Sequence, residues 1–393
     1  MNAELSRLVA QYMEQIIADR RRFHANPELS REEFETSQYI KTVLDAEGIE
    51  YKQMAGTGIA ALIRGKYPGK TIMIRGDMDA LPILEETNLP FASKNAGKMH
   101  ACGHDMHTAN LLGLVRILRH FKDTLHGNIK FCFQPAEEGA GGALMMIEDG
   151  VLEDPPVDYA IGMHIDPSIA VGSAALEDGP ITSYPQFFTI TLKGRGGHGS
   201  APFRSIDPIQ PAVRIYEGLS AITKEINPLH FNVVQVCAIN AGTAPAVIPD
   251  ECILKGTIRT HYAEDTQHIE KRVHEIVQAN AELFHVSYEI DCLGGSYPVV
   301  NNPAYTAKAR ESVKDIFDGG LVESVDFKMV GEDFSHYAAK VPASFIIVGC
   351  GNVPQGDPSY YPLHNGRFNP DEKALEYGAK ALGQIALDYL TGN

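Results

Sequence analysis

Short apolar segments and longer amphipathic segments alternate along the first half of the chain. Four short apolar runs predict strands covered on both faces: residues 59–63, 71–74, 129–133 and 159–163. Longer segments with apolar residues at helical spacing predict helices: residues 34–48, 108–121 and 142–147. This alternation is typical of an α/β sheet.

The polar residues before the first helix predict how it begins. Ser30 and Glu33 have the spacing of a capping box, in which each residue satisfies a backbone N–H of the first turn. The apolar face that follows consists of Phe34, Tyr39, Ile40, Val43 and Leu44. Gly48 is placed to end the helix.

The pattern changes near residue 183. Further strands are predicted at residues 187–192, 232–239, 252–259 and 286–290. One helix is expected to begin at Asp207 as N-cap, with Pro208 at its first position. A second helix is indicated by the apolar residues Ile269, Val273, Ile276 and Val277. The order β-α-β-β-α-β is that of a ferredoxin-like module.

From Gly294 the alternation of strands and helices resumes and ends in a helix after Asp371. We therefore predict an α/β protein with two domains. Residues 1–182 and 294–393 would form a discontinuous domain, with a mainly parallel mixed sheet between helices. Residues 183–293 would form an inserted ferredoxin-like α+β domain.

Composition narrows the classes of partner. The 34 Lys+Arg against 50 Asp+Glu give a formal charge of −16, which disfavours nucleic acid and anionic membrane surfaces. No apolar run reaches the roughly 18–20 residues of a membrane helix, and residues 1–4 lack the features of a signal peptide. The six cysteines have no framework spacing and should be reduced. We expect a cytoplasmic protein with a small-molecule ligand.

The densest cluster of metal-binding residue types lies at residues 100–107, where a loop leads into a helix. Cys102 and His104 are separated only by Gly103, which lets the backbone fold tightly. A thiolate beside an imidazole suits a borderline-soft divalent metal. A single histidine here would be explained as a helix cap, but two more histidines, His100 and His107, favour a metal site.

Two adjacent carboxylates, Glu137 and Glu138, follow the strand at residues 129–133. They lie at the strand end where α/β sheets place their sites. Because they repel each other unless they share a cation, one division has Glu138 on a metal and Glu137 holding a water. The alternative is an acidic helix N-terminus, which the helix dipole favours.

Two further histidines complete a possible ligand set. His164 follows a strand and His364 lies in a loop, and each alone would be explained as a buried, hydrogen-bonded histidine. The combined candidates are Cys102, His104, Glu138, His164 and His364. Five ligands exceed what one tetrahedral zinc with an open position needs, but they suit two metals that share a bridging group.

Four other residues are candidates for supporting roles. Asp77 and Asp79 follow a strand and would either orient a ligating imidazole or cap a turn. His198 lies among glycines that allow close approach to a ligand, and it could donate to an oxyanion or belong to a mobile loop. Arg259 ends a strand and could bind a substrate carboxylate or a surface acid.

Taken together, these segments resemble the two-metal aminoacylase and carboxypeptidase hydrolases, in particular the amidohydrolase branch with hippurate hydrolase and the plant auxin-conjugate hydrolases. The resemblance covers nearly the whole chain. It rests on residues 24–30, 76–82, 100–107, 135–139, 197–200, 247–250, 331–334 and 363–365.

The resemblance implies a metal-bearing α/β domain and an inserted lid domain that also forms the interface of a homodimer. It implies two divalent metals, for which Zn²⁺ or Mn²⁺ is expected and Co²⁺ or Ni²⁺ is the alternative. Their ligands would be Cys102, His104, Glu138, His164 and His364. Cys102 would be the bridge, Glu137 the general base and acid, and His198 a residue that reaches the partner's site.

This chain departs from the family pattern at two places. Better-known branches carry His-x-Asp where this chain has Asp77 and Asp79, so the first histidine ligand of those branches is absent here. The resemblance implies that Cys102 and His104 bind the metal in its place. The lid motif usually reads Asn-Val-Ile-Pro-Asp, but the asparagine position is Ala246 here. That asparagine is expected near the substrate carboxylate.

The expected reaction is metal-dependent hydrolysis of an N-acyl-L-amino acid with a small acyl group, to a carboxylate and a free amino acid. Metal-activated water would attack the amide, with Glu137 as general base. The alternative reaction is that of a dipeptidase or aminopeptidase with the same metals. A third hypothesis is a non-catalytic metal-dependent binding protein, which would keep the metal ligands but would not need Glu137 as a base.

Overall fold

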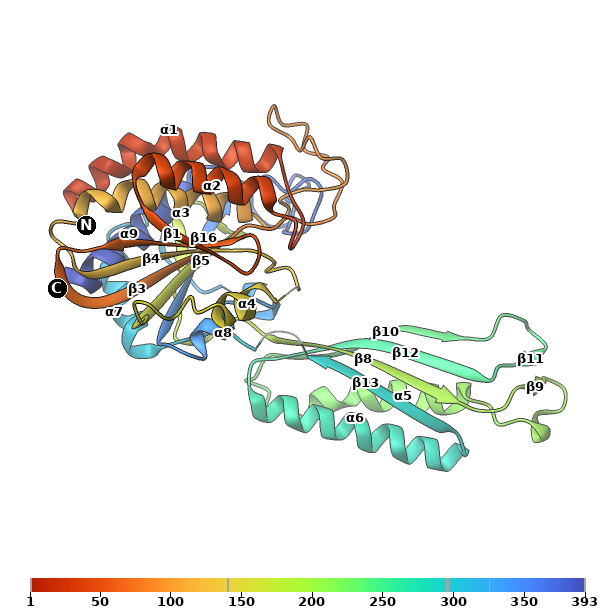
Figure 1. The fold of residues 1–393 in the computed structure, drawn as a ribbon. Coiled ribbons are helices and arrows are strands. Elements are labelled where there is room, and N and C mark those ends of the chain that lie inside the picture. Colours follow the sequence, from red (N-terminus) through yellow and green to blue (C-terminus); the bar gives the residue numbers. More distant parts are fainter. Residues whose placement is uncertain (1, 140, 295–296, 325, 392–393) are drawn as a thin grey trace. The chain divides into compact units, whose positions relative to one another are not determined.

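The chain folds into two units, described here from a computed structural model (Figure 1). The structure describes residues 2–139, 141–294, 297–324 and 326–391. The first unit comprises Met1–Gly179, Val299–Phe327 and Asp333–Asn393. The second comprises Pro180–Pro298 and Lys328–Glu332.

A mixed sheet forms the centre of the first unit. Among the described residues it has eight strands in the order β1-β2-β4-β3-β5-β16-β6-β15. Their bounds are Glu50–Met54 (β1), Gly58–Arg64 (β2), His126–Gln134 (β4), Tyr67–Asp77 (β3), Tyr159–Ala170 (β5), Ala343–Gly351 (β16), Ser173–Ala175 (β6) and Gly320–Leu321 (β15). The neighbours β4, β3, β5 and β16 are parallel, which confirms the predicted mixed, mainly parallel sheet.

Helices cover this sheet. Their bounds are Ala3–Ala25 (α1), Phe34–Glu47 (α2), His104–Leu118 (α3), Gly142–Glu148 (α4), Pro303–Val313 (α7), Ser335–Ala338 (α8) and Ala374–Thr391 (α9). Figure 1 shows α1, α2 and α3 on one side of the sheet and α4 and α8 on the other. Helix α1 was not predicted, although Leu5, Leu8, Val9 and Ile16 have helical spacing and are buried.

The start of α2 differs from the prediction. Its N-cap residue, Glu33, makes no side-chain capping bond. The Ser30 hydroxyl instead donates to Asp79 at 2.6 Å, and the Glu33 carboxylate accepts from the Ala136 N–H at 2.9 Å. The capping-box prediction is therefore wrong, because both side chains make tertiary contacts. The predicted end is confirmed, since Gly48 adopts the left-handed conformation.

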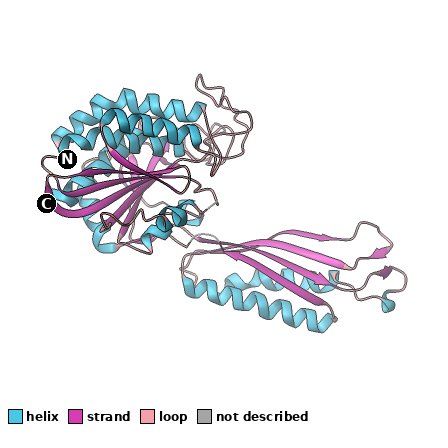
Figure 2. Cartoon of the chain, viewed as in Figure 1, coloured by secondary structure: helices cyan, strands magenta, loops and turns pink. Residues whose placement is uncertain are grey.

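The second unit is built on an antiparallel sheet. Within the described residues its four strands follow the order β10-β12-β8-β13. Their bounds are Asn232–Ala241 (β10), Glu251–Thr260 (β12), Tyr184–Lys193 (β8) and Ser287–Gly294 (β13). Helices α5 (Ile209–Ala221) and α6 (Ala263–Phe284) lie on one face of the sheet, as Figure 2 shows. Asp207 accepts from the N–H of Ile209, close to the predicted helix start.

This unit has its own apolar core. Side chains of β8 such as Ile190 pack with Ile215 of α5 and with Ile269 and Val273 of α6. A separate small ladder pairs β9 (Gly197–His198) with β11 (Val247–Ile248).

The remaining short elements of the two units are β7 (Gly179–Pro180), β14 (Val300–Asn301), η1 (Arg119–Phe121), η2 (Pro202–Arg204), η3 (Ile222–Glu225) and η4 (Asp326–Met329).

Two further predictions can be compared with the structure. All six cysteines are free, as expected from their spacing. In the part of the chain that the structure describes, no helix has the length and apolar character needed to cross a membrane.

Candidate metal centre and active site

The candidate site lies at the carboxyl ends of neighbouring parallel strands of the first unit. β3 ends at Asp77, β4 ends at Gln134 and β5 carries His164, and these strands are adjacent in the sheet. Loops that leave parallel strands at the same edge meet there, which is where α/β sheets bind ligands. Helix α3 begins in this region at His104.

A tight turn before α3 places the two central donors. Gly103 has φ 89°, a conformation that glycine adopts without strain. A Cβ at this position would lie 2.4 Å from the side chain of Ile165. A side chain at this position would be strained and would require Ile165 to shift, so glycine favours the turn that separates Cys102 from His104.

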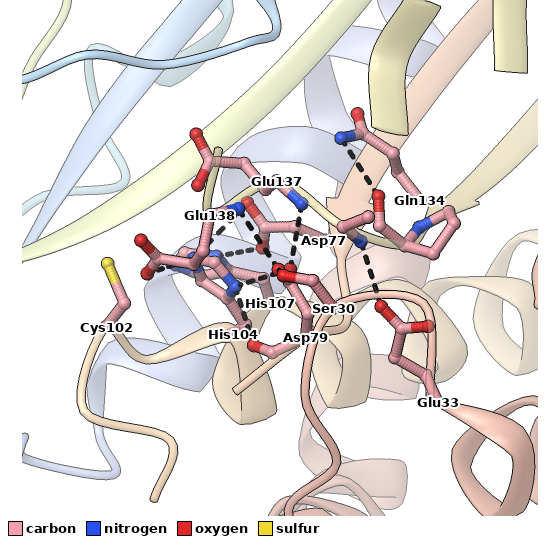
Figure 3. Close-up of polar contacts among 12 residues, drawn as sticks. Ser30, Glu33, Asp77, Asp79, Cys102, His104, His107, Gln134, Glu137 and Glu138 are labelled. Atoms are coloured by element: carbon pink, nitrogen blue, oxygen red, sulfur yellow. Dashed lines mark hydrogen bonds and ion pairs between the residues drawn. The ribbon is translucent and has the colours of Figure 1, made fainter. Parts of the chain in front are cut away.

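The structure brings all five predicted ligands together. Cys102 Sγ lies 3.4 Å from His164 Nε2 and 3.3 Å from His364 Nε2. Glu138 Oε1 lies 3.4 Å from His364 Nε2 and 4.0 Å from His104 Nε2. Figure 3 shows Cys102, His104 and Glu138 converging on one space. We call these five residues the donor cluster.

The donor cluster divides into two overlapping groups. Cys102, His104 and His164 have donor atoms within 4.8 Å of one another, and so do Cys102, Glu138 and His364. Cys102 belongs to both groups. This geometry is the one expected for two metals with a shared bridging ligand.

Two buried atoms of the donor cluster indicate whether these residues could bind a metal. His104 Nε2 and Glu138 Oε1 have no hydrogen-bond partner among the described residues. Burying a polar atom without a partner is costly, so such atoms in a folded protein call for an explanation. Sulfur, imidazole and carboxylate donors are ligands of Zn²⁺ and similar divalent metals. The residues present therefore fit a metal centre.

Burial and charge set the protonation of the donor cluster in the metal-free chain. Burial raises the pKa of the Cys102 thiol well above its ordinary value, and burial lowers the pKa of His164 well below its own. Burial also opposes a charge on His104, but the nearby Asp77 carboxylate outweighs it and raises the pKa of His104. A divalent metal held by these residues would favour the thiolate and the neutral imidazole.

Asp79 connects the donor cluster to the loop that carries the two glutamates, residues 136–138, which we call the Glu137 loop. Its carboxylate lies 3.3 Å from His104 Nδ1. It also accepts the N–H groups of Glu137 and Glu138, each at 3.0 Å (Figure 3). His104 Nδ1 also lies 2.9 Å from the backbone carbonyl of Asp79, so both groups of this residue lie near the imidazole.

Glu137 lies beside the donor cluster. Its carboxylate has an oxygen within 4.8 Å of donor atoms of His104 and Glu138. The N–H of Asp333 points at Glu137 Oε1 over 3.3 Å. A half-buried carboxylate in this place can accept a proton from a water bound at the donor cluster.

A buried network behind the site was missed by the sequence analysis. His107 Nδ1 donates to Asp77 at 2.6 Å, and His107 Nε2 accepts from the N–H of Ile165 at 3.1 Å. Arg75 donates to the other oxygen of Asp77 at 2.5 Å. Both ring nitrogens of His107 are thus in hydrogen bonds. The available signal was Arg75, a charged residue inside an apolar strand.

The second unit carries the other two candidates. His198 is exposed on β9, and its Nδ1 accepts from the Ser200 N–H at 3.1 Å. Arg259 lies over the ring of Phe187 at 5.1 Å and donates to the Ile258 carbonyl at 3.0 Å. Among the described residues Arg259 has no carboxylate within ion-pair distance.

Comparisons with known proteins give one family. Residues 73–388 match the model of peptidase family M20/M25/M40. Thermostable carboxypeptidase 2 of Saccharolobus solfataricus is 38% identical over 380 residues, which cover 95% of this chain and 95% of that protein. N-acetyl-L-cysteine deacetylase of Bacillus subtilis is 37% identical over 383 residues, which cover 96% of this chain and 89% of that protein.

A solved structure is similar over the same length. The YXEP protein of Bacillus subtilis, a dinuclear metal binding peptidase from the M20 family, superposes with a TM-score of 0.84 at 34% identity. The similarity covers 97% of this chain and 99% of that one.

Proposed function

The chain belongs to peptidase family M20/M25/M40 and is a hydrolytic enzyme of its amidohydrolase branch, and from this premise we propose that it hydrolyses N-acyl-L-amino acids. The products would be a carboxylate, from acetyl or another small acyl group, and a free amino acid. The observation that carries this proposal is the pair of donor groups that share Cys102 beside Glu137. The deacetylase relative supports the substrate class.

The donor cluster would hold two divalent metal ions, and Cys102 belongs to both of its groups. Similarity to a dinuclear metal binding peptidase supports two metals. Zn²⁺ or Mn²⁺ fits the mixed donors best, and Co²⁺ or Ni²⁺ is an alternative. When bound, such metals polarise the amide carbonyl and acidify the attacking water.

Glu137 would move the proton. Its carboxylate has an oxygen within 4.8 Å of donor atoms of His104 and Glu138, which is close enough for acid–base work on a water bound there. It would accept a proton from the attacking water and pass it to the leaving amine. The hydrogen bond from the Asp333 N–H would hold it in place between the two steps.

The second unit would act as lid and dimer interface. His198 of one chain would donate to the oxyanion in the partner's site, because its Nδ1 accepts from Ser200 and its Nε2 therefore carries the proton. Arg259 would bind the substrate carboxylate, since no carboxylate of the described chain pairs with it. Ala246, whose carbonyl accepts from the Gly199 N–H, has no side-chain amide that could bind the substrate carboxylate. Arg259 would therefore bind it alone.

A substrate panel tests the proposal. Protein loaded with a defined metal is given N-acetyl amino acids and matched dipeptides, which differ in the ammonium group next to the scissile bond. We expect turnover of the N-acetyl amino acids. Turnover confined to dipeptides would overturn the proposal in favour of a dipeptidase or aminopeptidase.

A further inference from the structure

Two buried carboxylates from outside the Glu137 loop accept three consecutive backbone N–H groups of that loop. Glu33 accepts the N–H of Ala136 at 2.9 Å. Asp79 accepts the N–H groups of Glu137 and Glu138, each at 3.0 Å. Figure 3 shows Glu33 on the side of the loop away from Cys102, and Asp79 beside His104. The backbone of the loop is thus held at every residue.

Glu33 is itself held in place by its surroundings. Its side chain is fully buried, and its second oxygen accepts from the Thr57 hydroxyl at 2.6 Å. The Arg31 N–H donates to the first oxygen at 3.0 Å. Burial raises the pKa of Glu33, and the nearby Asp79 carboxylate adds to this effect. Two acids buried close together disfavour folding unless hydrogen bonds offset the cost, and here the N–H and hydroxyl groups of the surroundings donate to both of them.

The backbone at Ala136 shows what these contacts support. Ala136 has φ 57°, in the left-handed region that residues with a Cβ disfavour and glycine adopts freely. It directly precedes Glu137 and Glu138. A change in this conformation would rotate the peptide that leads into both glutamates, so the direction of Glu137 depends on it.

We propose that Glu33 is a positioning residue: its carboxylate holds Ala136 in the left-handed conformation and thereby directs Glu137 toward the donor cluster. This inference rests on the proposed role of Glu137 as base. The contact that links Glu33 to the Glu137 loop is the hydrogen bond from the Ala136 N–H, so the proposed effect passes through the backbone.

The test compares substitutions at Glu33 in the full-length, metal-loaded enzyme. Glu33→Met has a similar length but no acceptor. We expect its kcat on an N-acetyl amino acid to fall about 10- to 100-fold, because a displacement on the order of 1 Å at a reacting group has effects of this size. KM should stay within about twofold and metal content near two per chain. Glu33→Gln keeps an oxygen for the Ala136 N–H and should recover most of the kcat.

Rescue separates positioning from general destabilisation. In the double variant Glu33→Met/Ala136→Gly, glycine adopts the left-handed conformation without help, so we expect kcat to rise above that of Glu33→Met. Asp19 is the matched control, since it is a buried acid that binds Arg116 and Tyr39, each at 2.6 Å. Asp19→Asn should lower Tm but leave kcat unchanged, with no benefit from Ala136→Gly.

The results that would overturn the inference are a wild-type kcat in Glu33→Met, or a loss that Ala136→Gly does not restore. Should Glu33→Met fail to fold, Thr57→Val removes one donor to Glu33 and is assayed in the same way, with a smaller, restorable loss expected. Glu137→Gln in the same assay separates the two proposals. An active Glu137→Gln contradicts the proposed base, whereas an inactive Glu137→Gln beside a fully active Glu33→Met contradicts only the role of Glu33.

Discussion

The donor cluster of the first unit and the His198 loop of the second unit, residues 197–200, differ in how their side chains are held. His104 is buried, with its Nδ1 beside Asp79. His198 is exposed, and its ring contacts Ser200, only two residues away. The side chains of the first site contact distant parts of the chain, whereas in the second site the backbone is paired with β11 and the ring of His198 contacts a residue close in sequence.

This difference has a consequence for catalysis. Buried, hydrogen-bonded side chains are ready to bind a metal as soon as the unit folds, because little rearrangement is needed. An exposed histidine on a short ladder gains a fixed direction only when something else contacts it. We therefore propose that metal binding and proton transfer belong to the first unit, and that oxyanion stabilisation requires an assembled form of the protein.

The strongest test of this contrast is removal of the proposed base. Glu137→Gln should lower kcat by about 10²- to 10⁴-fold, because the amide cannot accept the proton of the attacking water. Metal content, measured by elemental analysis, should stay near two per chain. An active variant would show that Glu137 is not the base.

A smaller loss is expected from the exposed site. His198→Ala should lower kcat about 10²- to 10³-fold, the usual effect of losing one oxyanion donor, while Tm stays the same because the side chain is exposed. Mixing His198→Ala with Glu137→Gln chains should restore part of the activity if His198 acts in the partner's site. Mixed dimers without recovered activity would argue against a site shared between chains.

Asp79 tests the contacts that organise the first site. Asp79→Asn should weaken metal binding about 10- to 100-fold, since residues that orient a ligating imidazole typically have effects of this size. The affinity is measured by competition with a chromophoric chelator. An unchanged affinity would mean that the contact of Asp79 with His104 does not matter for the metal.

Only some of this organisation could be predicted from the sequence. Cys102, His104 and Glu138 could be predicted because their side chains are typical metal ligands and because they lie in loops next to predicted strands or helices. The structure brings them together. Ser30 and Glu33 have the same residue types and spacing as a helix cap. Their actual partners lie 49 and 103 residues away in sequence, so local patterns carry no trace of them.

Other features of the site could not be predicted from the sequence for different reasons. Nothing in the sequence marks Ala136 as left-handed, because alanine is compatible with helix, strand and loop. The pairing of His107 with Asp77 depends on how α3 packs against β3, which is a tertiary property. By contrast, the second unit's strands and helices were predicted closely, since alternation and amphipathic spacing determine them.

The smallest expected effect concerns stability at the edge of the first site. Burial alone would lower the pKa of His24, but its contacts with Asp105 at 2.8 Å and Glu85 at 3.1 Å raise it. The stabilisation from protonated His24 is fully present below its ordinary pKa of about 6.5 and is lost as pH rises through the raised value. His24→Gln should therefore lower Tm more at pH 6 than at pH 9. An equal change in Tm at both pH values would contradict this assignment.

Metal positions provide the most direct test of the central claim, which is that the donor cluster binds two metals around Cys102. Crystals of the metal-loaded protein would be measured at the absorption edge of the metal. The account predicts two anomalous peaks in each chain, both within coordination distance of Cys102 and between His104, Glu138, His164 and His364. A single peak, or peaks away from Cys102, would contradict it.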